Sequence, residues 1–329
     1  MKRESIIEII VESIKLLDLD LCGLTVFTEA GSGHYLYTPL ISALAGAERT
    51  YAMIKDSRYG KKEDIADHLR RKMAELSIDD NKVFILHEKE PPAINRSDII
   101  TNLGFVRPIN KGFIDCMKKR SVISLMCEAW EYRKEDVDID YANDKGIPVV
   151  AVNEEDDRIR IMDYVGLLAE KKAGEIAPGA RVALFGSDKF TKKIEERTGW
   201  DVFGVDMFDR LISEIERYDV IVLSHHSVDN SPFFDTHNLE KVKDKTFIQI
   251  AGGLIDFQHA IKEGISVFPE RDVKPGYMGW TLAELGPKPV IHLHTAGLKV
   301  GERFKEFIEG RTEEINNILK DCKLCQKTR

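Results

Sequence analysis

Hydrophobic residues along the chain follow two different spacings. Short apolar runs, typical of buried strands, are separated by longer stretches in which apolar residues recur every three or four positions, as on one face of a helix. This alternation is typical of an α/β protein whose mainly parallel sheets are flanked by helices. The predicted strands form two sets, and hence two lobes: 24–27, 50–54, 82–86, 121–127 and 147–152, then 181–185, 202–205, 219–224, 246–251 and 266–268.

A long helix is predicted over residues 154–176, between the two sets of strands. Acidic residues mark its start, and Pro178 with Gly179 ends it. We interpret it as the connector that opens the second lobe. The predicted first domain, of a substrate-binding type, covers residues 1–150 and is completed by a C-terminal helix at 300–329. A Rossmann-like nucleotide-binding domain is predicted over 151–299.

The N-terminal residues predict an amphipathic helix rather than a secretory signal. Isoleucines recur at helical spacing, and Glu4, Glu8 and Glu12 interrupt any continuous apolar stretch. No apolar run in the sequence approaches the roughly 18–20 residues that a membrane span needs. We therefore expect a cytoplasmic protein without a membrane partner.

Composition narrows the classes of partner. The 329 residues suffice for two domains, and a hydrophobic content of 43% supports packed cores. The formal net charge of -8 argues against nucleic acid, which requires a basic face. Cys322 and Cys325 form a CxxC pair, which offers only two of the four ligands of a structural zinc site. We expect free tail cysteines and no metal.

The second lobe carries the strongest chemical signal, a strand–loop–helix–strand unit that ends at Asp206. An acid at this place accepts hydrogen bonds from a ribose diol and repels a 2′-phosphate, which favours NAD over NADP. It does not separate NAD from S-adenosylmethionine, which also carries ribose hydroxyls. The alternative is a solvated acid at the end of a strand.

The glycine loop of this unit, Gly186-Ser187-Asp188, contains one glycine where a dinucleotide fingerprint has three. Asp188 either places an anion where a pyrophosphate would lie or caps the following helix. Strand carboxyl ends are the usual ligand positions in open α/β sheets. The predicted cofactor contacts are accordingly Gly186, Ser187, Asp206, Ser224, His225, Ala251 and Gly252.

The first lobe has its own glycine loop, Gly31-Ser32-Gly33-His34, directly after its first predicted strand. Backbone amides at a helix start hold a carboxylate or a phosphate, and Ser32 and His34 add side-chain donors. We predict substrate contacts at Ser32, Gly33 and His34. The alternative is a tight turn that requires glycine.

Two histidines near the C-terminus, His292 and His294, are candidates for acid–base chemistry. If the run 290–294 is extended, alternation places both on one side. Histidine exchanges protons near neutral pH, and a carboxylate such as Glu270 would assist it. The alternatives are a two-histidine metal site without a third ligand, or polar residues near a hinge.

From about Asp98 onward the order of elements resembles the D-isomer-specific 2-hydroxyacid dehydrogenases. The similar segments are 137–149, 199–206, 239–256 and 294–297. The resemblance implies a substrate lobe built from both chain ends, a nucleotide lobe between them and a homodimer. It also implies hydride transfer between a 2-hydroxy acid and NAD, with His294 as acid–base residue and Glu270 as its partner.

The chain departs from this family at the substrate clamp. In this family an arginine binds the carboxylate of the substrate, and it stands just before the glycine of the segment that ends at Asp256 in this chain. At that position this chain has Ala251 or Gly252. A neutral residue cannot form the bidentate pair with a carboxylate. Arg58 or Arg107 is our hypothesis for a replacement.

The sequence thus favours an NAD(H)-dependent oxidoreductase for an unidentified small polar metabolite. One alternative is a transferase that uses S-adenosylmethionine or another nucleoside cofactor in the same cleft. The other is a non-catalytic ligand-binding homologue.

Overall fold

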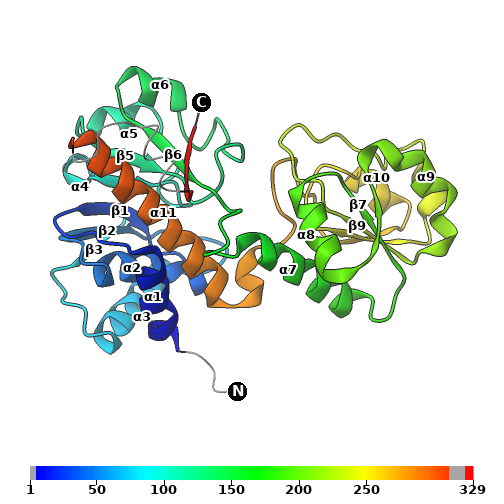
Figure 1. Cartoon of the computed structure of the whole chain (residues 1–329), viewed down its shortest axis with the longest axis horizontal. Helices are drawn as coiled ribbons and strands as arrows, with labels where there is room; N and C mark the ends of the chain where they lie inside the picture. Colours follow the sequence, from blue (N-terminus) through cyan, green and yellow to red (C-terminus); the bar gives the residue numbers. More distant parts are fainter. Residues whose placement is uncertain (1–4, 311–322, 329) are drawn as a thin grey trace. The chain divides into compact units, whose positions relative to one another are not determined.

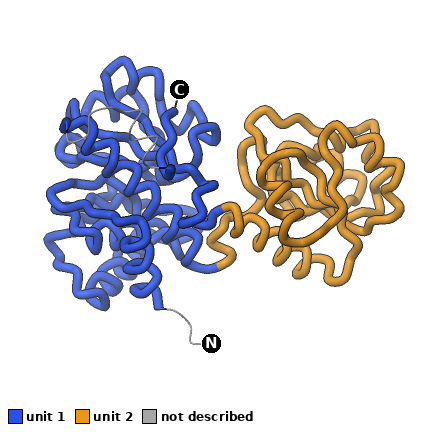
Figure 2. The backbone as a smooth tube through the Cα atoms, in the orientation of Figure 1, with its two compact units in different colours: residues 1–161, 286–329 blue, residues 162–285 orange. Residues whose placement is uncertain are grey.

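The computed structural model describes residues 5–310 and 323–328. The chain divides into two compact units, Met1–Ile161 with Gly286–Arg329 (unit 1) and Met162–Leu285 (unit 2), coloured separately in Figure 2. The boundaries predicted from the sequence, at residues 150 and 299, each differ from these by more than ten residues. Both units are α/β, with parallel strands flanked by helices, as the sequence predicts.

Unit 1 is built on a seven-stranded sheet in the order β12-β6-β5-β4-β1-β2-β3. Strands β1 to β6 are parallel, and β12 joins the edge antiparallel to β6. The strands are β1 (Thr25–Glu29), β2 (Arg49–Met53), β3 (Val83–Leu86), β4 (Ile99–Thr101), β5 (Val122–Ser124), β6 (Val149–Val152) and β12 (Cys325–Lys327).

The parallel strands of unit 1 follow the order 3-2-1-4-5-6, which is that of dinucleotide-binding Rossmann folds. The sequence suggested Rossmann character for the second lobe alone. In such sheets ligands bind where the strand order reverses, at the carboxyl ends of the central pair. For unit 1 this point lies between β1 and β4.

Three helices of unit 1 begin at a residue whose side chain caps the first turn, namely Ser5, Asn110 or Asp138. In α1 the Ser5 side chain accepts from the Glu8 amide while the Glu8 carboxylate accepts from the Ser5 amide, a complete capping box. The helices are α1 (Ile6–Leu17), α2 (Thr38–Leu44), α3 (Lys62–Glu75), α4 (Pro91–Arg96), α5 (Lys111–Cys116), α6 (Ile139–Asp144) and α11 (Pro287–Ile308), with a 3₁₀ turn, η1, at Gly33–Leu36.

Helix α11 packs against β4, β5 and β6 of the unit 1 sheet (Figure 1). Glycines allow the close approach: a Cβ on Gly297 would lie 2.1 Å from the Met126 sulfur, and one on Gly301 would lie 2.7 Å from Cγ2 of Ile99. The extended conformation considered for 290–294 is therefore wrong, because these residues lie inside this helix. Pro287 suits the first turn of a helix. Because the helix is buried on several faces, the alternation of apolar and polar residues over 290–294 did not indicate a strand.

Two short strands escaped prediction. They are β4 and β12, with three residues each. Strand β12 buries Cys325 against β6, in the segment expected to hold free tail cysteines. Residues 311–322 of the predicted tail helix, Cys322 among them, lie outside the described residues. Of the rest, 300–308 belong to α11, whereas 325–327 form β12, so the predicted helix is wrong at its end.

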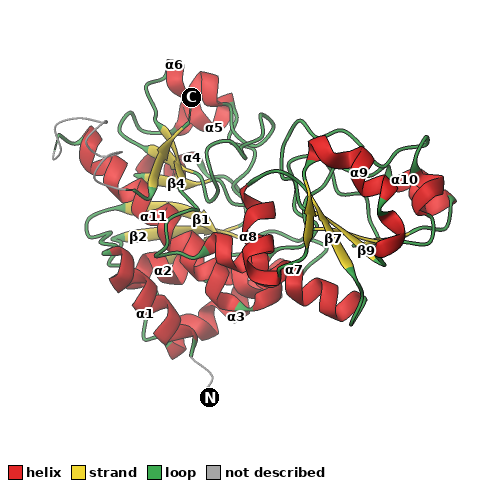
Figure 3. Cartoon of the chain, turned by 45° about the vertical axis from the view of Figure 1, so that its right-hand side comes forward, coloured by secondary structure: helices red, strands yellow, loops and turns green. Residues whose placement is uncertain are grey.

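Unit 2 is built on a five-stranded parallel sheet in the order β11-β10-β9-β7-β8 (Figure 3). Each strand predicted in the second half of the chain forms. They are β7 (Val182–Phe185), β8 (Asp201–Phe203), β9 (Val220–Leu223), β10 (Thr246–Gln249) and β11 (Ser266–Phe268). The helices are α7 (Ile161–Ile176), α8 (Lys189–Thr198), α9 (Phe208–Ser213) and α10 (Phe257–Lys262).

The strand order of unit 2, taken along the chain, is 2-1-3-4-5, the other common doubly wound arrangement. Its reversal lies between β7 and β9. Helix α8 ends at Gly199, which adopts the left-handed conformation with φ 66° as a C-cap requires. In the part of the chain that the structure describes, no helix has the length and apolar character for crossing a membrane.

Candidate functional site

The loop after β7 approaches the end of β9 at the reversal point of unit 2. A Cβ on Gly186 would lie 2.3 Å from Thr191 Oγ1, 2.7 Å from Ser224 Oγ and 2.9 Å from the His225 nitrogen. Glycine is required here because the two loops touch, and the contact of Gly186 with a cofactor stays a prediction. The predicted glycine is therefore a structural necessity of the switch point.

Asp188 caps helix α8. Its Oδ1 accepts from the Thr191 amide at 2.9 Å and from the Thr191 hydroxyl at 3.0 Å, while Oδ2 accepts from the His226 amide at 2.5 Å. The sequence left open whether Asp188 caps the helix or places an anion near a pyrophosphate, and the structure shows that it caps the helix. A carboxylate is thereby fixed at the helix start, where backbone amides would otherwise stabilise a bound pyrophosphate.

Asp206 lies in a 3₁₀ turn, η2 (Val205–Met207), just beyond β8, with its side chain exposed. A Cβ on Gly204 would lie 2.5 Å from Asp206 Oδ1 and 3.1 Å from Ser187 Oγ, so the acid sits beside the loop after β7. Ser187 in turn accepts from the Val205 amide at 2.8 Å. The structure thus brings the predicted ribose acid and the predicted loop together.

The remaining predicted cofactor residues follow β9 and β10. Ser224 is fully buried, with its hydroxyl 2.9 Å from that of Thr191, which makes it a structural group. The Asn230 amide nitrogen donates to the carbonyls of His225 at 2.7 Å and Gly252 at 2.9 Å, and so ties the two loops. Nδ1 of His225 is buried without a hydrogen-bond partner among the described residues.

His294 lies in unit 1, within α11, and is buried. Its Nδ1 is 2.6 Å from the hydroxyl of Thr38, and the Tyr35 ring lies 5.9 Å away. Burial lowers the pKa of His294 to about 3, which keeps the imidazole neutral in ordinary solution. Glu270 is exposed and belongs to unit 2. Their acid–base pairing stays a prediction.

Sequence reasoning missed Glu29, the last residue of β1, at the reversal point of unit 1. Its side chain is buried, and the Phe105 amide donates to its Oε2 at 2.6 Å. Burial raises the pKa of this carboxyl to about 7, although the Phe105 hydrogen bond and Arg107 both lower it. The available signal was an acid that ends an apolar strand directly before a glycine loop.

The predicted substrate residues Ser32, Gly33 and His34 form the loop that follows Glu29. Gly33 has φ 61°, so the turn does require a glycine. Nδ1 of His34 is buried without a partner among the described residues, and burial lowers the pKa of its imidazole. The loop therefore offers an unsatisfied nitrogen close in sequence to the buried carboxyl.

The two arginines considered as clamps differ in their surroundings. Arg107 belongs to the loop after β4, and its Nη1 lies 2.7 Å from Asp136, which Arg133 also contacts at 2.5 Å. Arg58 is exposed and donates to the hydroxyl of its neighbour Tyr59. Arg107 is thus the arginine beside Glu29, and part of its charge is already neutralised.

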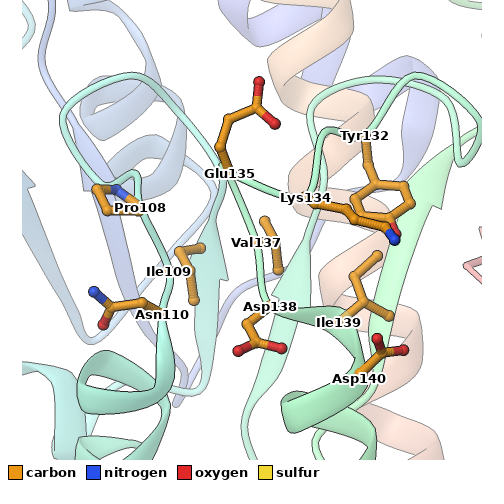
Figure 4. A pocket seen from close by; sticks show the side chains of 10 residues that line it. All are labelled: Pro108, Ile109, Asn110, Tyr132, Lys134, Glu135, Val137, Asp138, Ile139 and Asp140. Atoms are coloured by element: carbon orange, nitrogen blue, oxygen red, sulfur yellow. The ribbon is translucent and has the colours of Figure 1, made fainter. Parts of the chain in front are cut away.

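A cavity of about 300 Å³ opens beside the loop that follows Arg107. Figure 4 shows the side chains that line it. Two of its lining groups are helix caps, because Asn110 accepts from the Phe113 amide and Asp138 from the Tyr141 amide. Its other lining residues are Pro108, Ile109, Tyr132, Lys134, Glu135, Val137, Ile139 and Asp140. Among the described residues, no three His, Cys, Asp or Glu side chains are grouped as a metal site requires.

No family model matches the sequence, and no curated protein matches it. Solved structures do match. A protein assigned as a D-3-phosphoglycerate dehydrogenase from Ralstonia solanacearum aligns over 90% of this chain and 97% of its own, with 9% identity and a TM-score of 0.53. At this identity the likeness shows a shared two-domain α/β fold.

Two further matches are weaker. The apo D-mandelate dehydrogenase of Rhodotorula graminis aligns over 79% of this chain and 94% of its own, with 12% identity and a TM-score of 0.36. Shikimate 5-dehydrogenase of Listeria monocytogenes, solved with shikimate and NAD, aligns over 43% and 50%, with 13% identity and a TM-score of 0.32. These TM-scores are too low to carry an argument.

Proposed function

We propose that the chain is a nicotinamide-dependent oxidoreductase that binds its cofactor on unit 2 and a small polar substrate on unit 1. The observation that carries the proposal is the place of Asp206, exposed beside Ser187 at the reversal point of a doubly wound sheet. A carboxylate there accepts hydrogen bonds from both hydroxyls of a ribose and repels a 2′-phosphate. The shared fold with a dehydrogenase supports the same assignment.

The residues fit the two ends of the cofactor unequally. Asp206 suits the ribose of a nucleoside, whereas the Asp188 cap repels a pyrophosphate. The proposal implies weak dinucleotide binding, with ribose recognition as its main source of specificity. The substrate would be a small polar metabolite, and a homodimer is the expected assembly.

The test is an equilibrium titration of NADH fluorescence with the full chain. We expect NADH to bind more tightly than NADPH, and Asp206→Ala to weaken NADH binding and to reduce the preference. Asp209→Ala is the matched control, because Asp209 is a nearby exposed acid in α9. Absence of NADH binding at millimolar concentration would refute the proposal.

A second candidate function has one specific observation in its favour. A nucleoside cofactor without a pyrophosphate, such as S-adenosylmethionine, avoids the carboxylate of Asp188 at the start of α8. A transferase would then use the same reversal point of unit 2. Thermal stabilisation by S-adenosylhomocysteine with none by NADH would select this function over the first.

A further inference from the structure

Unit 1 holds a buried carboxyl group that no part of the fold accounts for. Glu29 ends the central strand β1, with only 6% of its surface exposed. Its Oε2 accepts from the Phe105 amide at 2.6 Å. Burial of a carboxyl group costs stability, so a purely structural role is a poor explanation.

Glycines flank both oxygens of this carboxyl. A Cβ on Gly31 would lie 3.4 Å from Oε1, and one on Gly104 would lie 3.2 Å from Oε2. The two glycines come from the loops after β1 and β4, which meet at the reversal point of the sheet. The carboxyl therefore stands at the position where this fold binds ligands, with no side chain from either glycine to cover it.

Arg107 is a charged group that lowers the pKa of Glu29, in addition to the Phe105 hydrogen bond. The register partner of Glu29 on β2 is Met53, and in the loop after β1 the Cβ of Tyr35 lies 2.8 Å from the position of a Cβ built on Gly31. The loop after β4 contributes Arg107, whose charge is shared with Asp136.

We propose that Glu29 is the proton-exchanging group of a ligand site at the carboxyl edge of the unit 1 sheet, where its Oε1 bonds a hydroxyl or carbonyl oxygen of a small polar molecule. The ionised carboxylate accepts the proton of a ligand hydroxyl, and the neutral acid returns a proton to a ligand oxygen. A pKa of about 7 makes both forms available at neutral pH. The class of ligand rests on the proposed function; the site itself does not.

The experiment is infrared difference spectroscopy of the full chain without cofactor, which follows the C=O band of protonated carboxyl groups with pH. We expect one band that disappears between about pH 6 and 8 and is missing in Glu29→Gln. Glu88→Gln, at an exposed position, is the control that keeps the band. If the wild-type chain has no carboxyl band titrating in this range, the proposal is overturned.

The ligand arm compares lactate with propionate, two probes that differ by the hydroxyl group. We expect lactate to shift the Glu29 band and propionate to leave it unchanged, and no response to lactate would also overturn the proposal. If Glu29→Gln fails to fold, Gly104→Ala replaces it, because its Cβ crowds Oε2 and must change the band. Failure of NADH to bind would refute the proposed function and leave this result intact.

Discussion

Nδ1 of His294, on α11, lies 2.6 Å from the hydroxyl of Thr38, on α2. Both side chains are buried, and they join two elements of unit 1 that are 256 residues apart in sequence. The histidine that the family resemblance marks for catalysis is thus part of a polar contact inside unit 1.

The first prediction concerns the stability of unit 1 in mild acid. The folded-state pKa of His294 is about 3 and its ordinary value is 6.5, so between these values the unfolded chain binds a proton that the folded chain does not. Stability from this group is complete above pH 6.5 and is lost as the pH falls, by about 1.4 kcal/mol for each pH unit. Urea unfolding at pH 7, 5.5 and 4.5 should show a smaller acid loss in His294→Gln than in wild type.

The exposed His237 supplies the control for this experiment. Its substitution by glutamine should leave the pH dependence unchanged. Equal slopes for wild type and His294→Gln would show that His294 is protonated in the folded chain, and would restore it as a group that titrates near neutral pH.

The second prediction concerns Glu29 and has the opposite sign. Its folded-state pKa of about 7 lies above the ordinary value of 4.5, so its contribution is complete below pH 4.5 and declines as the pH rises through 7. At about 1.4 kcal/mol for each pKa unit, ionisation costs about 3 kcal/mol above pH 7. Glu29→Gln should therefore be more stable than wild type at pH 8.5 and similar at pH 4.5, by urea unfolding.

A variant that is less stable than wild type at both pH values would contradict this prediction. It would mean that the ionised carboxyl is well satisfied in the folded chain. The exposed Glu88→Gln should track wild type throughout.

The third prediction compares two glycines of unit 2. A Cβ at Gly186 would meet Thr191, Ser224 and His225 within 2.9 Å, so Gly186→Ala should destabilise unit 2 by about 1–3 kcal/mol. A Cβ at Gly174, within α7, would have no neighbouring atom within 4 Å, and Gly174→Ala should be neutral or stabilising by up to about 1 kcal/mol. Thermal unfolding of the two variants measures the difference. Equal melting temperatures would mean that the loop after β7 moves to accommodate the added Cβ without a loss of stability.

The fourth prediction concerns the charge at the start of α8. Asp188→Asn keeps a good N-cap and removes the anion. If a pyrophosphate approaches this helix, NADH should bind more tightly by about 1 kcal/mol, roughly fivefold, at low salt. Fluorescence titration of Asp188→Asn against Asp209→Asn tests this. Unchanged affinity in Asp188→Asn would place the phosphates away from α8.

Local sequence predicts most of the elements but not how the sheets are ordered. Gly199 ends α8 and Asp188 caps it because turn and cap preferences depend on neighbouring residues alone. The run around His294 was misjudged because a helix buried on several faces has no polar stripe to reveal its period. Strand order in unit 1 depends on contacts between distant segments, and no local pattern encodes it.

The sequence by itself determined the two-lobed α/β class, the strands of unit 2 and the position of Asp206 after β8, since each follows from short-range patterns of apolar and turn residues. Tertiary structure alone decided that Glu29 is buried at a reversal point, that His294 is neutral beside Thr38 and that Asp188 bonds the amide of His226. The physical reason is that desolvation and hydrogen bonding set these properties, and both depend on which distant segments the fold brings together.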